Sequence, residues 1–360
     1  MKTLVIYFKN DDNAALSYQH AWVKVFKKNI LFNCNFLNLK NFFPFYRTKP
    51  NITQLKNLLF EKYDCIIILH SAFSNACLIP AYIQKIIRHK KAFKIFFVGN
   101  EFKHMPEKIK FTNYIRTNLF ITMSHKDDVL NLYKNHLKTN VVYIPSGGFD
   151  KEIFYPKIKY DERTIDIGFR STSEPFYFGH QDTSKLFFEL ENFSYKSKKK
   201  FDISISYKDR FAGNNWVNFL NNCKCLVSSN RYFDYFSLND DLRNEVNKFT
   251  QFDFNKIYNK FFKNRKKECE ARWLTGKTIE AAACKTSLIL LEGDYGNDFV
   301  PNKHYINLNK DFSNLEESID KLNDISFIKE ITNNAYKLVT ENYTYDNHLY
   351  KLYKTIKKLI

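Results

Sequence analysis

The chain carries the sequence KTIEAAACKTSLILLEGDY at residues 277–295. A cation and a carboxylate stand at the start of a predicted helix, three alanines allow close packing, and an apolar run typical of a buried strand leads into a glycine turn. A helix N-terminus gathers unpaired N–H groups and partial positive charge, which suit a diphosphate. Lys277 would add a full charge, and Glu280, one turn along, could accept hydrogen bonds from two ribose hydroxyls. An ordinary helix with an exposed Lys and Glu is the alternative.

The surrounding sequence alternates between strands and helices. In the second half, apolar runs predict strands at 165–168, 202–206, 225–228, 287–291 and 305–308, and helices lie near 183–193, 216–222, 241–262 and 277–283. The first half predicts strands at 4–8, 65–69, 94–98, 119–123 and 141–144, and helices at 14–28, 52–61 and 127–137. Such alternation, with strands apolar throughout, indicates parallel sheets covered on both faces. We therefore predict an α/β protein with two doubly wound domains, whose ligand lies beyond the carboxyl ends of the strands.

The two series are separated by a segment rich in turn residues. Residues 144–150 contain one proline and two glycines, and Phe154-Tyr-Pro156 follows. This places the first domain at 1–156 and the second at 157–340. Residues 341–360 complete a helical, Lys-rich tail that either caps the second domain or crosses back to the first.

Composition limits the classes of partner. The 360 residues include 56 basic and 38 acidic side chains, a formal net charge of +18, but only ten of the basic residues are Arg. Arg is the residue that recognises phosphates and bases bidentately, and a Lys excess is also what an AT-rich genome produces. Single-stranded nucleic-acid binding would need aromatic and Arg residues gathered on one strand face, a cluster that the sequence lacks. We expect no nucleic-acid partner.

Cysteine usage and hydropathy indicate the compartment. The seven cysteines form no CxxC pair and are interpreted as reduced thiols. The sequence has no signal-peptide pattern and no apolar run of the roughly 18–20 residues that span a bilayer. We expect a cytoplasmic protein. Peripheral contact with the inner face of an anionic membrane stays open, because basic runs occur at Lys196–Lys200 and Lys263–Lys267; solvated surfaces are the alternative.

Several blocks resemble a known family. Residues 277–295 are similar to the pattern R-x-F-E-A-A-A-x-x-T-x-x-I-L-x-E-G-x-Y of GT-B glycosyltransferases, specifically the bacterial CgeB-like and group 1 related enzymes. The similarity extends from about Ala92 to the C-terminus, including a hinge-like segment at 140–156 and blocks at 166–170, 178–179, 202–204, 209–224, 301–308 and 311–314. The resemblance implies two Rossmann-like domains facing a cleft, with a nucleotide-sugar donor on residues 157–340 and the acceptor approached by residues 1–156.

The resemblance also implies roles for individual residues. Glu280 would bind the donor ribose, while Lys277 and Arg170 would balance the departing diphosphate. Further donor-binding candidates are Lys185, Glu292 and Gly293. Cations and helix N–H groups can stabilise that leaving group without a metal, so no metal or other cofactor is expected.

In the first domain, two strand ends carry candidate catalytic residues. Glu101 follows a buried strand and is the preferred catalytic or acceptor-binding carboxylate, with helix capping as the alternative. His70 ends another strand and is a second candidate, as is the pair Ser124-His125; a structural histidine is the alternative for both.

Three departures from the family pattern affect the functional prediction. Arg272 stands eight positions before Glu280, where retaining group 1 enzymes carry a second Glu; Lys277 replaces the usual Arg; and residues 227–234 lack the usual Gly and Glu-Ser-Gly. We predict a glycosyltransferase of bacterial surface glycan synthesis, with a glycan or lipid-linked acceptor and the stereochemistry left open. The alternative is a non-catalytic relative that binds nucleotides or carbohydrates.

Overall fold

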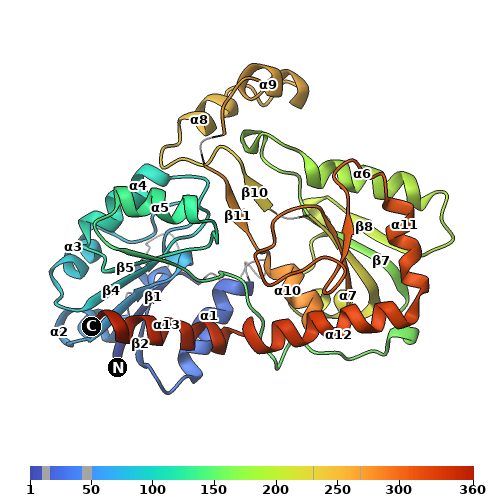
Figure 1. Cartoon of the computed structure of the whole chain (residues 1–360). Coiled ribbons are helices and arrows are strands. Elements are labelled where there is room, and N and C mark those ends of the chain that lie inside the picture. The colour runs from blue at the N-terminus through green and yellow to red at the C-terminus, as the bar shows by residue number, and fades with distance from the viewer. Residues whose placement is uncertain (10–16, 43–50, 230, 268) are drawn as a thin grey trace.

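The computed structural model describes residues 1–9, 17–42, 51–229, 231–267 and 269–360. It contains two parallel sheets of six and five strands, each flanked by helices, and a smaller antiparallel pair between them (Figure 1). The prediction of two doubly wound α/β sheets is therefore confirmed. The first residues of the helix predicted at 14–28 lie outside the described part of the chain.

The first sheet is parallel throughout, with strand order β2-β1-β3-β4-β5-β6. Its strands are β1 (Lys2–Tyr7), β2 (Asn33–Asn38), β3 (Cys65–Ile68), β4 (Phe93–Phe97), β5 (Leu119–Thr122) and β6 (Asn140–Tyr143). Its helices are α1 (Ser17–Lys28), α2 (Ile52–Phe60), α3 (Ala81–His89), α4 (Met105–Tyr114) and α5 (Asp127–His136). The central strands are buried on both faces, whereas the edge strand β2 is half-exposed and rich in Asn. Its sequence therefore lacks the apolar run by which strands were predicted.

The second sheet has the order β13-β12-β9-β7-β8. Its strands are β7 (Ile165–Arg170), β8 (Phe201–Ser204), β9 (Cys223–Ser228), β12 (Ser287–Leu291) and β13 (Ile306–Leu308). Its helices are α6 (Asp182–Ser194), α7 (Gly213–Asn222), α10 (Gly276–Ala283), α11 (Leu315–Asp320) and α12 (Ile325–Asn342). Gly168 in β7 permits close packing, because a Cβ atom there would lie 2.4 Å from the Cys223 sulfur.

An insertion between β9 and β12, which we call the arm, comprises residues 231–267 and 269–273. Strands β10 (Arg231–Phe233) and β11 (Ala271–Trp273) pair antiparallel at its base, and helices α8 (Asp241–Asn247) and α9 (Phe254–Phe261) project beyond the body of the molecule (Figure 1). The single helix predicted at 241–262 is wrong. Helix α8 ends at Asn247, and Asp253 starts α9 as its extended N-cap by accepting the Lys256 N–H at 3.0 Å.

The C-terminal chain returns to the first sheet. Helix α12 ends at Asn342, and α13 (Tyr345–Leu359) is capped by Thr344, whose hydroxyl accepts the Asn347 N–H. Helix α13 buries Leu349, Leu352 and Ile356 in the same apolar cluster as Trp22 of α1. The predicted crossing back to the first domain is thus observed (Figure 1). Among the described residues, no helix combines the length and apolar character needed to cross a bilayer.

Candidate functional site

A pocket of about 380 Å³ lies where the carboxyl ends of the two parallel sheets meet. The loop after β5 contributes Lys126, the arm contributes Tyr232, Glu270 and Arg272, and the loops after β12 and β13 contribute the rest: Glu292, Gly293, Asp294 and Lys310. Open α/β sheets bind ligands at this end of their strands. The pocket therefore lies where the sequence predicts a ligand.

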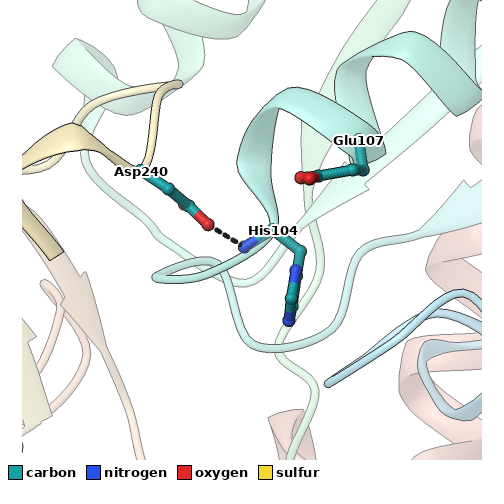
Figure 2. A group of neighbouring side chains, drawn as sticks. All are labelled: His104, Glu107 and Asp240. Carbon is teal, nitrogen blue, oxygen red and sulfur yellow. Dashed lines mark hydrogen bonds between the residues drawn. The ribbon is translucent and has the colours of Figure 1, made fainter. Parts of the chain in front are cut away.

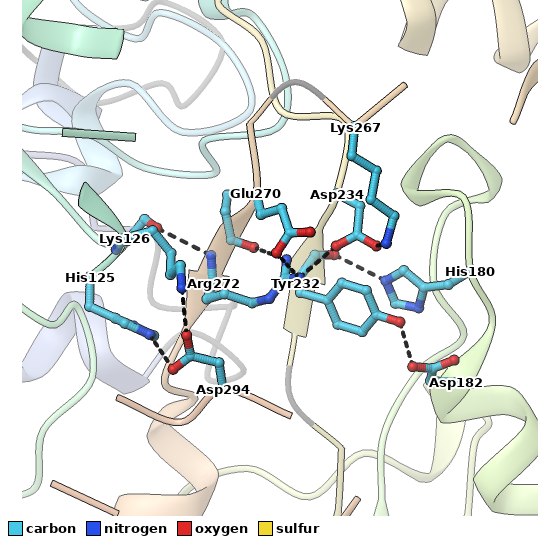
Figure 3. Close-up of polar contacts among 12 residues, drawn as sticks. His125, Lys126, His180, Asp182, Tyr232, Asp234, Lys267, Glu270, Arg272 and Asp294 are labelled. Carbon is cyan, nitrogen blue, oxygen red and sulfur yellow. Dashed lines mark hydrogen bonds and ion pairs between the residues drawn. The ribbon is translucent and has the colours of Figure 1, made fainter. Parts of the chain in front are cut away.

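Asp294 links the two halves of the chain beside this pocket. Its carboxylate contacts His125 Nε2 at 2.8 Å and accepts hydrogen bonds from Lys126 Nζ at 2.9 Å and from the Gly296 N–H (Figure 3). Burial alone would raise the pKa of Asp294, but these donors hold it below the usual range. A carboxylate held in this way is an ionic contact across the pocket and a poor proton acceptor at neutral pH.

Arg272 is the centre of a second polar group, at the base of the arm. Its guanidinium contacts Asp234 and Glu270, each at 2.7 Å, and lies 4.7 Å from the centre of the Tyr232 ring (Figure 3). His180 stacks on the same ring at 3.7 Å, and Lys310 Nζ lies 4.9 Å from its centre. The position that carries a Glu in the resembled motif is thus filled by a cation with two carboxylate partners of its own.

A cationic group surrounds the start of α10. Lys277 Nζ donates to Ser171 Oγ at 3.3 Å, and burial lowers the pKa of Lys277 to about 8, with Arg231 and Arg210 adding to the effect and Glu174 opposing it. Burial also lowers the pKa of Arg231, again with Glu174 acting in the opposite sense. Lys277 and Arg231 thus have Glu174 as their common carboxylate neighbour and Arg210 as a further cation nearby, which leaves an excess of positive charge beside a helix N-terminus. Such a group suits a diphosphate.

Glu174 also fixes the neighbouring helix α6. The buried carboxylate accepts the Thr183 N–H at 2.5 Å and the Ser184 hydroxyl at 3.5 Å, both in the first turn of that helix. Sequence analysis missed Glu174, Arg210 and Arg231. Both arginines left a weak signal: Arg231 lies in the segment 227–234 that departs from the family pattern, and Arg210 lies in the block 209–224 that resembles it.

Glu280 lies one turn into α10 and faces inward. It accepts a hydrogen bond from Trp216 Nε1 at 2.8 Å, and burial raises its pKa to about 7. Next to it, the hinge-like segment meets the helix: a Cβ atom on Gly147 would lie 2.8 Å from the Gly276 Cα. Only glycine at position 147 permits this approach, which places the link between the two sheets against the Lys277–Glu280 turn.

The remaining donor-binding candidates are dispersed. The Arg170 guanidinium contacts Asp202 on β8 and lies over the Phe211 and Phe219 rings at 4.8 and 4.9 Å, so it is not part of the cationic group. Lys185 is exposed on the surface of α6. Glu292 and Gly293 line the pocket, where Glu292 accepts the Lys310 N–H at 3.4 Å.

Glu101 is completely buried. Its oxygens accept hydrogen bonds from the Thr122 hydroxyl at 2.6 Å, the Met123 N–H at 3.1 Å and Trp273 Nε1 at 3.0 Å. Burial raises the pKa of Glu101, against the effect of these donors. The carboxylate joins the first sheet to the base of the arm and does not line the pocket.

His70 is equally enclosed. It packs between Trp22 and Phe97, and burial lowers its pKa to about 3, so the imidazole is neutral. His70 does not line the pocket either. His125, in contrast, reaches the pocket edge through Asp294.

His104, Glu107 and Asp240 could together hold a metal ion, because one ligand atom of each lies within 4.8 Å of the others (Figure 2). The Asp240 carboxylate already accepts the His104 and Met105 N–H groups at 2.6 and 3.3 Å and contacts Arg243 at 2.7 Å. These contacts satisfy the carboxylate and attach the arm to α4. The group is better explained as an anchor than as a metal centre.

Comparison with known proteins places this geometry in a fold class. No protein-family model and no curated protein sequence matches the chain. Among solved structures, T4 phage BGT in complex with its UDP-glucose substrate aligns at TM-score 0.55 and 13% identity, over 100% of this chain and 99% of that one. Anabaena Alr3699/HepE in complex with UDP and glucose aligns at TM-score 0.53 and 9% identity, over 99% and 100%. The chain also covers 53% of TarM, with 80% of its own length, at TM-score 0.48 and 13% identity.

The matches to T4 phage BGT and to HepE, together with the two facing parallel sheets, show that the chain has the GT-B fold.

Proposed function

We propose that the chain is a glycosyltransferase that moves a sugar from a nucleotide-sugar donor to an acceptor. The observation that carries the proposal is the cationic group of Lys277, Arg231 and Arg210, which stands one helical turn from Glu280 in a GT-B fold. The crystallised T4 phage BGT, which has this fold, holds UDP-glucose. A diphosphate needs cations, and a ribose needs an acceptor of hydrogen bonds. The first turn of α10 supplies Lys277 and Glu280, and neighbouring segments supply Arg231 and Arg210.

In the proposed reaction an acceptor hydroxyl attacks the anomeric carbon of the donor sugar. The bond from that carbon to the diphosphate breaks, the nucleoside diphosphate leaves with the electron pair, and the hydroxyl proton passes to water. Lys277 and Arg231 stabilise the leaving charge, Glu280 holds the ribose, and the pocket between Lys126 and Gly293 takes the sugar. None of these steps needs a metal, and we propose none.

We further propose, from the sequence resemblance, an acceptor that is a bacterial surface glycan or its lipid-linked precursor, and a cytoplasmic enzyme that touches the membrane peripherally. A non-catalytic binding relative is the second candidate. Arg272 favours the binding relative. It stands where retaining enzymes of the resembled group carry a Glu, and its side chain is held in two ion pairs.

The test has two stages. A thermal-shift screen against UDP, GDP, CDP, ADP and their common sugars should give a selective rise in Tm with one nucleotide, because a ligand that binds only the folded state stabilises it. Release of that nucleoside diphosphate from its sugar, in the presence of mixed glycan acceptors, would then support the transferase. A Tm shift without any release would favour the binding relative, and the absence of any shift would contradict the donor site itself.

The shifted pKa values of Glu280 and Lys277 predict a bell-shaped pH dependence of donor affinity. Ribose hydroxyls donate to the charged form of Glu280, whose pKa of about 7 means that affinity rises as the pH rises through 7. The diphosphate needs the protonated form of Lys277, whose pKa of about 8 means that affinity falls as the pH rises through 8. We expect a maximum between these values and a loss of about fivefold one pH unit outside them.

Titration calorimetry with the nucleotide-sugar selected by the screen checks this profile, because its phosphates carry no titrating proton in the range. Glu280→Gln should weaken binding and remove the acid limb, and Lys277→Arg should remove the alkaline limb. An unchanged profile in either variant would contradict the role given to that residue.

A further inference from the structure

The tip of the arm, residues 247–267, concentrates positive charge and aromatic rings. Its seven cations are all exposed: Lys248, Lys256, Lys260, Lys263, Arg265, Lys266 and Lys267. Asp253 is its one acidic residue, so the tip carries six net positive charges. The other basic run, Lys196–Lys200, has no aromatic residue within it.

Rings are exposed on the same segment. Phe252 is 43% and Tyr258 39% accessible, and Phe249, Phe254 and Phe261 are partly so. Lys260 Nζ lies 3.8 Å from the centre of the Phe249 ring, which leaves its charge at the aromatic surface. Exposed aromatic side chains among lysines on a short amphipathic helix are typical of segments that lie in the interface of a bilayer.

The tip is packed against the first domain and is connected to the pocket wall. Ile257 and Phe262 are buried in the same apolar cluster as the first-sheet strands, and Asp240 binds the start of α4. Lys267 contacts Asp234, which contacts Arg272 on the pocket wall. Figure 1 shows α8 and α9 beyond both sheets, with β10 and β11 leading back between them. Whatever the tip binds is therefore held at a fixed position relative to the pocket.

We propose that the arm tip docks on a bilayer that contains anionic lipids, with Phe252 and Tyr258 entering the headgroup region and the lysines over it. The charge is complementary to such a surface, and the cations are lysines apart from Arg265, which suits a diffuse field better than bidentate recognition of single phosphates. A further step rests on the proposed function: the docked arm would present the pocket to an acceptor carried by a membrane lipid.

Co-sedimentation of the full chain with vesicles tests this surface without any donor, so its result is separate from that of the transferase assay. Vesicles of phosphatidylcholine with phosphatidylglycerol should bind the chain, and vesicles of phosphatidylcholine alone should bind it much more weakly. The triple variant Lys263→Glu/Arg265→Glu/Lys266→Glu should lose about 100-fold in affinity for the anionic vesicles. Lys267 is left unchanged because it belongs to the ion pairs that lead to the pocket.

The matched control carries the same change of charge elsewhere: Lys196→Glu/Lys198→Glu/Lys200→Glu should bind within about threefold of the parent. Equal losses in the two triple variants would overturn the proposal, because only net charge would then matter. Phe252→Ser, which keeps the charge, should bind several-fold more weakly, and unchanged binding would overturn the insertion of the ring. Tighter binding to single-stranded RNA than to anionic vesicles, lost in the same triple variant, would assign the tip to nucleic acid instead.

Discussion

Lys277→Ala is expected to lower the affinity for the donor's nucleoside diphosphate by about 10²-fold while leaving the melting temperature of the unliganded protein nearly unchanged. Charge-assisted hydrogen bonds contribute roughly 1.5–3 kcal/mol, or 10- to 150-fold in affinity. The low dielectric that depresses the pKa of Lys277 places it at the upper end of that range. The free energy of unfolding should change little, because the Lys277 ammonium donates one weak hydrogen bond, to Ser171.

Titration calorimetry at pH 7.5 measures this loss. Lys329→Ala removes an exposed lysine from α12 that has no part in the cationic group, and should bind like the parent. Lys277→Arg keeps the charge and should recover most of the affinity. If Lys277→Ala and Lys329→Ala bind equally well, the diphosphate is held elsewhere, and the donor site at the start of α10 is wrong.

The two sheets could be predicted because their central strands are apolar on both faces. Ser287–Leu291 and Cys65–Ile68 are buried at every position. In a chain that alternates strands and helices, a short apolar run of this kind indicates a central strand of a parallel sheet. Residues 33–38 form an edge strand that pairs on one side only and needs no such run. The strands of the arm, three residues each, are too short to give a pattern.

The candidate site could be predicted only in part, because its groups come from loops whose course the sequence does not fix. Lys277 and Glu280 lie on one helix, and their relation follows from the helical repeat. Arg231, a member of the cationic group, and Glu174, its acidic neighbour, come from the segments that follow the adjacent strands β9 and β7. Arg170 shows the opposite case: its place at a strand end suggests a phosphate contact, but Asp202 on the neighbouring strand contacts its guanidinium.

Glu101→Ala is expected to destabilise the fold by about 3–5 kcal/mol. The substitution leaves Trp273 Nε1, the Thr122 hydroxyl and the Met123 N–H without their acceptor in a dry interior, and each unsatisfied buried donor costs about 1–3 kcal/mol. It also separates the base of the arm from the first sheet. Thermal and urea unfolding, followed by Trp fluorescence, should show a fall in Tm of several degrees or more.

Glu101→Gln distinguishes this role from catalysis. The amide has one acceptor oxygen where the carboxylate has two, so it cannot accept from all three donors, and its NH₂ group adds a donor. The substitution should therefore lower stability by about 1–3 kcal/mol. A residue that acts as general base would behave in the reverse way: Glu101→Gln would keep its Tm and lose kcat by 10²-fold or more. Trp273→Phe, which removes one donor and keeps the ring, supplies the matched partner for a double-mutant cycle. Strong coupling between positions 101 and 273 in unfolding, with turnover changed only in proportion to the folded fraction, is the result expected of a carboxylate that joins the arm to the first sheet.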